Sequence, residues 1–238
     1  MEKIRINKYL ANLGIDSRRA IDKLIEEGKI LVNGSVALSG MKVDENDEII
    51  INGKNINKKT QSKKVYFMLN KPQKVLSAVK DDRGRKLVTD LIDTDERIFP
   101  IGRLDYDTEG LIILTNDGDI YNRVIHPRGE VFKTYYVEIQ GNISMTSLNK
   151  IKKGIELDGK MTLPAKAKII SSTSNSTTLN VSIKEGKNRQ IRRMFESVGH
   201  KVTFLKRIAI GNLLLDEKLK IGDYRPLKKI EINYLYSL

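Results

Sequence analysis

Apolar residues near the start of the chain recur at helical spacing. Between positions 6 and 13 they fall on one face of an amphipathic helix, which Gly14 can end. Ser17 can cap a second helix, whose apolar stripe covers positions 20–25 and stops before Gly28. The pattern therefore predicts two short helices in succession.

The spacing then changes to that of strands. Apolar runs at 30–32 and 36–38 flank Asn33-Gly34, a pair typical of a tight hairpin turn. A third strand is expected at 48–51. Two helices followed by a small antiparallel sheet are expected for this first part of the chain.

Strand-like and helix-like patterns are interspersed from residue 65 onward. The apolar, β-branched run 111–114 is bounded by turn residues and predicts a buried strand. Further strands are expected at 65–70, 133–139, 166–170 and 178–183, and helices at 120–125, 145–151 and 189–198. This mixture favours an α+β architecture over a regular doubly wound sheet.

The polar, basic stretch 59–64 has no hydrophobic periodicity and is expected to be a linker. It divides the chain into a small domain, 1–58, and a larger domain, 65–238. Residues 1–64 carry a net charge of +4 and the remainder carries +9. Both predicted domains are therefore basic.

The net charge of +13 over 238 residues favours a polyanionic partner, with nucleic acid as the leading candidate. An anionic membrane surface could also select for this charge. No apolar run approaches the ~18 residues that cross a bilayer, and no secretory signal opens the sequence. We expect a soluble, cytoplasmic, monomeric protein that does not bind membranes.

Metal binding is not expected from the side chains available. The sequence has no cysteine, which excludes disulfides, thiolate nucleophiles and cysteine-ligated zinc. Its two histidines, His126 and His200, lie far apart in sequence, and cap or surface roles are their ordinary interpretation.

The first turn of the second predicted helix carries Arg18 and Arg19, where the free backbone amides already present partial positive charge. A phosphate bound by these amides and guanidinium groups would relieve the repulsion. Alternatively, both arginines point into water and lean on Asp22, Glu26 or Glu27 across helix turns. The spacing leaves both interpretations open.

Asp105 lies in the segment Gly102-Arg103-Leu104-Asp105, just upstream of the predicted buried strand 111–114. A loop anchored by a rigid strand is a common mount for a catalytic group. The alternative is a solvated acid that caps its own turn.

Arg192 lies beside the apolar stripe of the helix predicted at 189–198, whereas Arg189 and Arg193 point nearly opposite. A guanidinium that reaches inward needs a carboxylate partner, and Asp105 is the expected one. The alternative is that all three arginines contact phosphates at the surface.

The first domain resembles the αL RNA-binding domain first seen in ribosomal protein S four. The resemblance covers roughly residues 2–53 and rests on these segments in order: Arg5-Ile6-Asn7-Lys8-Tyr9-Leu10, Ser17-Arg18-Arg19, Leu24-Ile25-Glu26-Glu27-Gly28-Lys29 and Val32-Asn33-Gly34. It implies that Arg5, Lys8, Arg18 and Arg19 contact structured RNA.

The larger domain resembles ribosomal-RNA pseudouridine synthases of the RsuA and RluB type. The resemblance rests on the Gly-Arg-Leu-Asp segment, the arginine-rich helix, Leu69-Asn70-Lys71-Pro72 and Lys133-Thr134-Tyr135. It implies a mixed, mainly antiparallel sheet flanked by helices. It also implies that Asp105 is the catalytic aspartate, Tyr135 the active-site tyrosine and Arg192 the partner of Asp105.

Further functional expectations follow from that resemblance. Arg103 would support the loop and contact RNA, as would Arg189 and Arg193. The reaction turns uridine into pseudouridine without a redox change, so no cofactor is expected. The partner would be ribosomal RNA or a pre-ribosomal particle, with large-subunit (23S) RNA favoured over small-subunit (16S) RNA. A non-catalytic RNA-binding assembly factor is the alternative. By pattern alone, an ordinary core tyrosine in a strand is the favoured interpretation of Tyr135.

Overall fold

The computed structural model describes residues 3–56, 63–125 and 131–238. These residues form two compact units, one of residues 1–65 with 95–97 and the other of residues 66–94 with 98–238. His126 and most of the expected linker 59–64 lie outside the described residues. Within the described ranges, no helix is long and apolar enough to span a bilayer.

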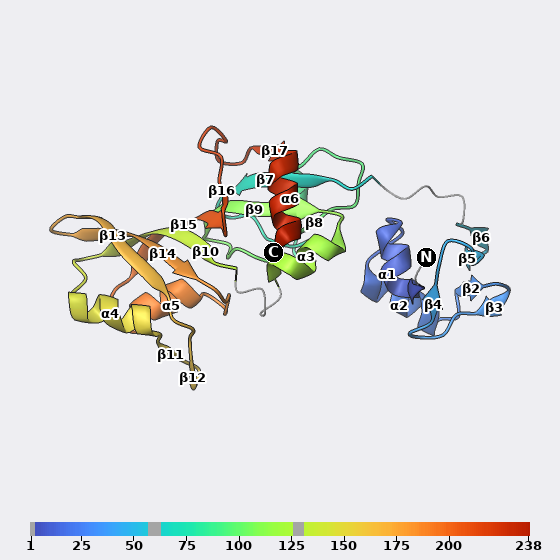
Figure 1. The fold of residues 1–238 in the computed structure, drawn as a ribbon, viewed down its shortest axis with the longest axis horizontal. Helices are drawn as coiled ribbons and strands as arrows, with labels where there is room; N and C mark the ends of the chain where they lie inside the picture. The colour runs from blue at the N-terminus through green and yellow to red at the C-terminus, as the bar shows by residue number, and fades with distance from the viewer. Residues whose placement is uncertain (1–2, 57–62, 126–130) are drawn as a thin grey trace. The chain divides into compact units, whose positions relative to one another are not determined.

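The first unit contains the two helices and the small sheet that the sequence predicts (Figure 1). Its elements are β1 Ile4–Arg5, α1 Ile6–Asn12, α2 Arg18–Glu26, β2 Ile30–Val32, β3 Ser35–Val36, β4 Lys42–Val43, β5 Ile49–Ile51 and β6 Lys54–Asn55. Ser17 caps α2 by accepting a hydrogen bond from the Ala20 amide at 3.1 Å. Asn33 and Gly34 both have positive φ, at 49° and 79°, which the tight hairpin turn requires.

The second unit is built on one large sheet (Figure 1). Its strands are β7 Tyr66–Lys71, β8 Phe99–Pro100, β9 Glu109–Thr115, β10 Lys133–Gln140, β13 Lys166–Ser172, β14 Ser176–Ile183, β15 Val202–Ile210, β16 Leu213–Leu214 and β17 Tyr224–Pro226, with a separate hairpin of β11 Glu156–Leu157 and β12 Lys160–Met161. Its helices are α3 Gly118–Ile125, α4 Met145–Lys153, α5 Gln190–Glu196 and α6 Lys229–Ser237, with a 3₁₀ turn, η1, at Thr89–Leu91.

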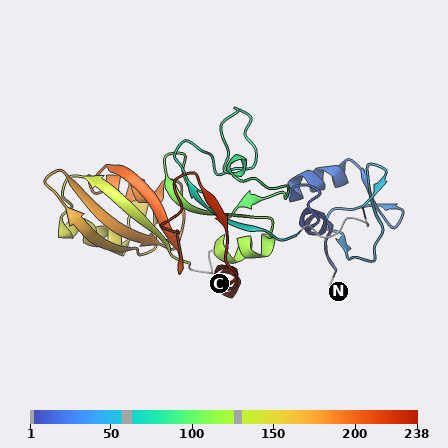
Figure 2. The ribbon, with the colours of Figure 1, turned by 90° about the horizontal axis from the view of Figure 1, so that it is seen from above.

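The main path of this sheet runs β13-β14-β10-β15-β9-β7-β17. Only β15 and β9 pair in parallel within this path, so the sheet is mixed and mainly antiparallel, which confirms the expected α+β class. Strands β10, β13, β14 and β15 form one twisted layer, visible in yellow to orange in Figure 2.

Two hydrophobic cores flank different parts of the sheet. One joins β10, β14 and β15 to α4 and α5, with Val137, Leu179, Leu148 and Phe195 buried in it. The other joins β7 and β9 to α3 and α6. The predicted strand 111–114 is fully buried in β9, so the loop that precedes it has a rigid base.

Strand β15 and helix α6 are the two largest elements of this unit that were not expected from sequence. Strand β15 lies between β10 and β9 at the centre of the sheet, although its sequence mixes apolar residues with Lys206 and Arg207. Helix α6 packs against α3. Its Tyr236 hydroxyl donates to the buried carboxylate of Asp117, which also accepts from Tyr66 at 2.8 Å.

Candidate active site

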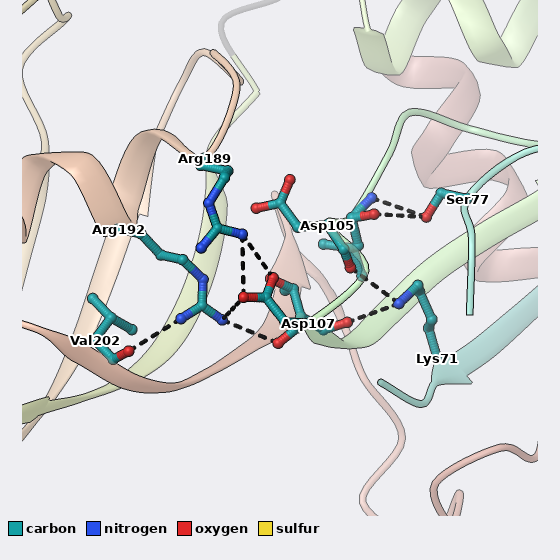
Figure 3. Close-up of polar contacts among 9 residues, drawn as sticks. Lys71, Ser77, Asp105, Asp107, Arg189, Arg192 and Val202 are labelled. Atoms are coloured by element: carbon teal, nitrogen blue, oxygen red, sulfur yellow. Dashed lines mark hydrogen bonds and ion pairs between the residues drawn. The ribbon is translucent and has the colours of Figure 1, made fainter. Parts of the chain in front are cut away.

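The loop between β8 and β9 carries Asp105, and a lysine at the end of β7 holds its backbone. The side chain of Lys71 is fully buried, and its Nζ donates to the carbonyl oxygens of Pro72, Asp105 and Thr108 at 3.0, 3.1 and 2.9 Å. Figure 3 shows this ammonium group reaching the loop that carries Asp105. A lysine ammonium has three N–H donors, so each finds an acceptor. The charge of Lys71 is thereby used to hold the loop in one conformation.

Burial lowers the pKa of Lys71 to about 8, although the nearby carboxylates of Asp105, Asp107 and Glu109 oppose this shift. Below that pH the ammonium form predominates. The positively charged anchor is therefore present at neutral pH.

A hydroxyl group adds a second anchor on the other side of the loop. The Leu104 amide donates to Ser77 Oγ at 3.1 Å, and Ser77 Oγ donates to the Leu104 carbonyl at 3.0 Å. Within the loop, the Thr108 amide donates to the Asp105 carbonyl at 3.1 Å. Backbone groups on both sides of Asp105 are thus satisfied, which leaves its side chain to be presented by a rigid frame.

Helix α5 begins one residue later than expected, at Gln190, and it ends at Glu196. Arg189 precedes it in the left-handed conformation, with φ 48° and ψ 33°. From that position its Nη1 donates to both carboxylate oxygens of Asp107, at 3.0 and 3.1 Å. Arg189 therefore faces the loop, and the expectation that it points away is wrong.

Arg192 reaches inward as expected, but its partner is Asp107, and the expected pairing with Asp105 is wrong. Its Nη2 lies 3.3 Å from a carboxylate oxygen of Asp107 and donates to the Asp107 carbonyl at 3.0 Å, while Nη1 donates to the Val202 carbonyl at 3.1 Å. The helical periodicity correctly predicted a buried arginine. It could not distinguish two carboxylates that lie two positions apart on the same loop.

Asp105 has a different environment from Asp107. Its side chain is half-buried, and within the described part of the chain its carboxylate forms no hydrogen bond or ion pair. In Figure 3 no dashed line joins this carboxylate to the two guanidinium groups that hold Asp107. An acidic group left without a protein partner on a fixed loop is available to a substrate.

Asp105 lines a cavity of about 220 Å³. Asp105, Arg103 and Tyr135 are among its lining residues, and Tyr135 projects from β10 opposite Val181 of β14. The cavity is completed by Thr108, Ile183, Gly186, Lys187, Asn188, Gln190, Ile191 and Leu205. The residues brought together are thus an acid, a phenol, two cations and an apolar wall.

The remaining sequence-predicted residues lie outside this cavity. Arg193 donates to the carboxylate of Asp158 at 2.6 Å. In the first unit, Arg5, Arg18 and Arg19 are exposed and Lys8 is half-buried. Arg18 and Arg19 form no ion pair within the described residues, so they do not lean on acids of their own helix, although both point into solvent as that alternative expects.

Sequence reasoning missed three supporting residues. Asp107 follows Asp105 by two positions in the same acidic segment, so the sequence gives no reason to single it out. Lys71 and Ser77 are remote from the loop in sequence. A lysine directly after an apolar strand and before a proline was the available signal for Lys71, although the pattern does not reveal the three carbonyls it meets.

Comparison with known proteins agrees with this architecture. Residues 65–197 match the family model described as RNA pseudouridylate synthase, and residues 4–49 match the S4 domain. The chain belongs to the RNA pseudouridylate synthase family, and its activity is the isomerisation of uridine.

Its relatives are similar over their whole length. It is 44% identical to the ribosomal large subunit pseudouridine synthase B of Bacillus subtilis, over 98% of this chain and 96% of that protein. It is 42% identical to an uncharacterized RNA pseudouridine synthase of Aquifex aeolicus, over 100% of this chain and 95% of that protein. A crystal structure of a pseudouridylate synthase superposes with a TM-score of 0.71 at 32% identity, covering 98% of this chain and 99% of the other.

Proposed function

We propose that this protein is a site-specific pseudouridine synthase that acts on ribosomal RNA of the large subunit. The family and the name of the Bacillus subtilis relative support the substrate class. The observation that carries the proposal is the Asp105 carboxylate, which forms no hydrogen bond or ion pair with any described residue, while Asp105 and Tyr135 line one cavity. Asp105 and Tyr135 are the proposed catalytic residues, and Arg192, which binds Asp107, is a proposed positioning residue.

The reaction requires the base to leave the RNA helix. Extruding a nucleotide costs a few kcal/mol of lost stacking and pairing, which binding in the cavity must offset. The apolar wall of Ile183, Ile191 and Leu205 offers the uracil a dry surface. Tyr135 lines the same cavity, and its ring would stack on the extruded base.

The chemistry itself breaks the bond between N1 and C1′ and forms a bond between C1′ and C5. The proton on C5 is released, and N1 gains one, so the sum is an isomerisation without redox change. A carboxylate can serve it by attacking C1′ or by removing a ribose proton on the way to a glycal. Asp105 is the group for this step, and the Tyr135 phenol can assist removal of the C5 proton.

Recognition is assigned to the basic residues. Arg5, Lys8, Arg18 and Arg19 would contact RNA through the first unit, and Arg103 through the rim of the cavity. Arg189 and Arg193 already hold Asp107 and Asp158, so a phosphate would have to share their donors. We therefore assign these two residues a weaker part in RNA binding.

The test uses large-subunit ribosomal RNA that lacks the modification and carries tritium at C5 of uridine. The wild-type protein should release tritium, and Asp105→Asn should not, because an amide cannot replace the anionic carboxylate. Asp82→Asn is the matched control, since Asp82 is exposed and lies outside the cavity.

Equal release by wild type and Asp105→Asn would refute the role of Asp105. Binding without any release by the wild type would instead support a non-catalytic assembly factor. Mapping pseudouridines in ribosomal RNA from cells with and without the protein identifies the target. A change confined to small-subunit RNA would reject the proposed substrate.

A further inference from the structure

The half of the sheet made of β13, β14, β10 and β15 has two faces, and the active site uses only one of them. On that face Tyr135, Val137 and Ile139 of β10 pack towards α4 and α5. Side chains alternate along a strand, so Tyr136 lies on the opposite face. That opposite face carries residues to which neither the reaction nor the core assigns a role.

Strand register places four of these side chains in one row across the sheet. Lys168 of β13 pairs with Asn180 of β14, Asn180 pairs with Tyr136, and Tyr136 pairs with Lys206 of β15. Lys168 is exposed, and the other three are half-buried. We call this row, together with the neighbouring pocket described next, the second face.

The pocket lies beside the row and has a volume of about 400 Å³. Its lining includes Tyr234 of α6 and, from the sheet and its flanking segments, Phe132, Thr134, Lys166, Ser182 and Asn212. The Nζ atoms of Lys166 and Lys184 lie 4.4 and 5.2 Å from the centroid of the Phe132 ring. The Phe132 ring, which lines the pocket, thus has two lysine ammonium groups close to it.

Charge on the second face is largely uncompensated. Lys166, Lys168 and Lys206 form no ion pair with any described residue. The acid that β10 contributes to this face, Glu138, accepts a hydrogen bond from the Tyr136 hydroxyl at 3.1 Å. The surface therefore combines cations that have no acidic partner among the described residues with the aromatic rings of Phe132, Tyr136 and Phe204, and the last two rings pack edge to face at 6.1 Å.

We propose that the second face binds a single-stranded segment of the substrate RNA, away from the uridine held in the active site. The lysines would bind phosphates, and unpaired bases would stack on Phe132 and Tyr136. Aromatic rings on a sheet recognise bases that are free to unstack, so a continuous duplex would not fit. The proposal rests on the RNA substrate proposed above and adds a contact to it.

The first experiment measures binding of a short fluorescent oligouridylate at several salt concentrations. The test variant combines Lys166→Gln, Lys168→Gln and Lys206→Gln. The matched control combines Lys150→Gln, Lys153→Gln and Lys160→Gln, which removes equal charge from exposed lysines on α4 and β12. The salt slope should fall by about 2 in the test variant, at ~0.7 per lost phosphate contact, and stay unchanged in the control.

The second experiment uses the wild-type protein and oligouridylate that contains 4-thiouridine. Irradiation should crosslink the RNA to peptides that contain Phe132 or Tyr136. Tyr136→Leu should weaken binding roughly tenfold, as expected when one base loses its aromatic stacking partner.

Equal salt slopes in the two triple variants, or crosslinks confined to other surfaces, would overturn the proposal and point to an acidic protein as the occupant of this face. These binding readouts do not depend on turnover. Crosslinking at the second face by a protein that releases no tritium would reject the proposed enzyme function while supporting this contact.

Discussion

At the scale of single residues, two aspartates on one loop have separate tasks. Asp107 is held by Arg189 and Arg192, and its carbonyl also accepts from Arg192. Asp105 is left without a charged partner among the described residues. Because both arginines already bind the Asp107 carboxylate, the Asp105 carboxylate is left to the substrate. Asp107 thus joins the loop to α5 while Asp105 faces the cavity.

Asp107→Asn should destabilise the fold, because the Arg192 side chain is only 9% exposed and would lose its counter-charge. Breaking a fully buried pair costs 3–5 kcal/mol, and Asp107 is 43% exposed, so we expect a loss of about 1–3 kcal/mol. Urea unfolding measures this loss. Asp105→Asn, which touches neither arginine, is the control and should stay within about 0.5 kcal/mol of wild type. Equal stabilities of the two variants would contradict the role of Asp107 as the charged partner of Arg192.

Lys71 gives a pH dependence with a defined sign. Its folded pKa of about 8 lies below the ordinary value of 10.5, so between these pH values the unfolded chain binds the proton that the folded chain has lost. The free energy of unfolding should therefore rise with pH in that window through this group.

Activity should change in the opposite sense. A neutral amine has two N–H donors for three carbonyls, so the loop carrying Asp105 loses a hydrogen bond, and the turnover rate should fall above about pH 8. NMR of ¹³C-labelled lysine follows the titration directly. In Lys71→Arg, which stays charged, this resonance should be absent and the fall in rate should disappear. A titration midpoint for Lys71 near that of exposed lysines would refute the lowered pKa of this group.

At the scale of elements, the parallel contact between β9 and β15 brings the loop and α5 together. Gly110 lies at this contact with φ 103°, and a Cβ there would lie 2.2 Å from the Arg207 carbonyl oxygen. Only glycine allows this approach, because both the conformation and the space exclude a side chain. The buried Arg207 adds a hydrogen bond from its Nε to the Leu111 carbonyl at 2.7 Å.

Gly110→Ala should cost about 2–5 kcal/mol of stability, from backbone strain together with overpacking. Gly84→Ala is the matched control, since Gly84 also has positive φ, at 69°, but has no neighbour within 4 Å of a built Cβ. Gly84→Ala should lower the free energy of unfolding only by the conformational penalty of about 1–2 kcal/mol. Thermal unfolding of both variants measures the difference, and equal losses would show that the contact with Arg207 is not limiting.

Elements with a clean local pattern were predictable, and those without one were not. Neighbouring residues in the sequence determine the structure of the run 111–114 and of the Asn33-Gly34 turn. In β15, Lys206 and Arg207 interrupt the apolar sequence, so neither alternation nor a continuous apolar run appears. Its central place comes from pairing with β10 and β9, which are distant in sequence.

At the scale of the whole molecule, positive charge is present in both parts of the chain, at +4 for residues 1–64 and +9 for the rest. RNA binding should therefore depend strongly on salt. In the first unit the exposed Arg18 and Arg19 lie at the capped start of α2, where backbone amides also face outward. Phosphate contacts should concentrate there.

Replacing Arg18 and Arg19 by alanine should reduce the salt slope of binding to ribosomal RNA by about 0.7 for each lost contact if the contacted strand is single. Filter binding over a salt series measures it. Lys23→Ala with Lys29→Ala is the control, since both lysines already pair with Glu27 in the same unit. An unchanged slope in the arginine variant would remove these residues from the interface.

The sequence by itself determined the local elements, the acidic loop before a buried strand, the buried arginine of α5 and the basic character of the chain. These properties depend on near neighbours and on composition, which a linear pattern records. Only the tertiary structure decided that Arg192 binds Asp107, that Lys71 supports the Asp105 loop and that Tyr135 shares a cavity with Asp105. Such partners come from remote segments, and differences of a few ångströms in packing select among chemically equivalent groups.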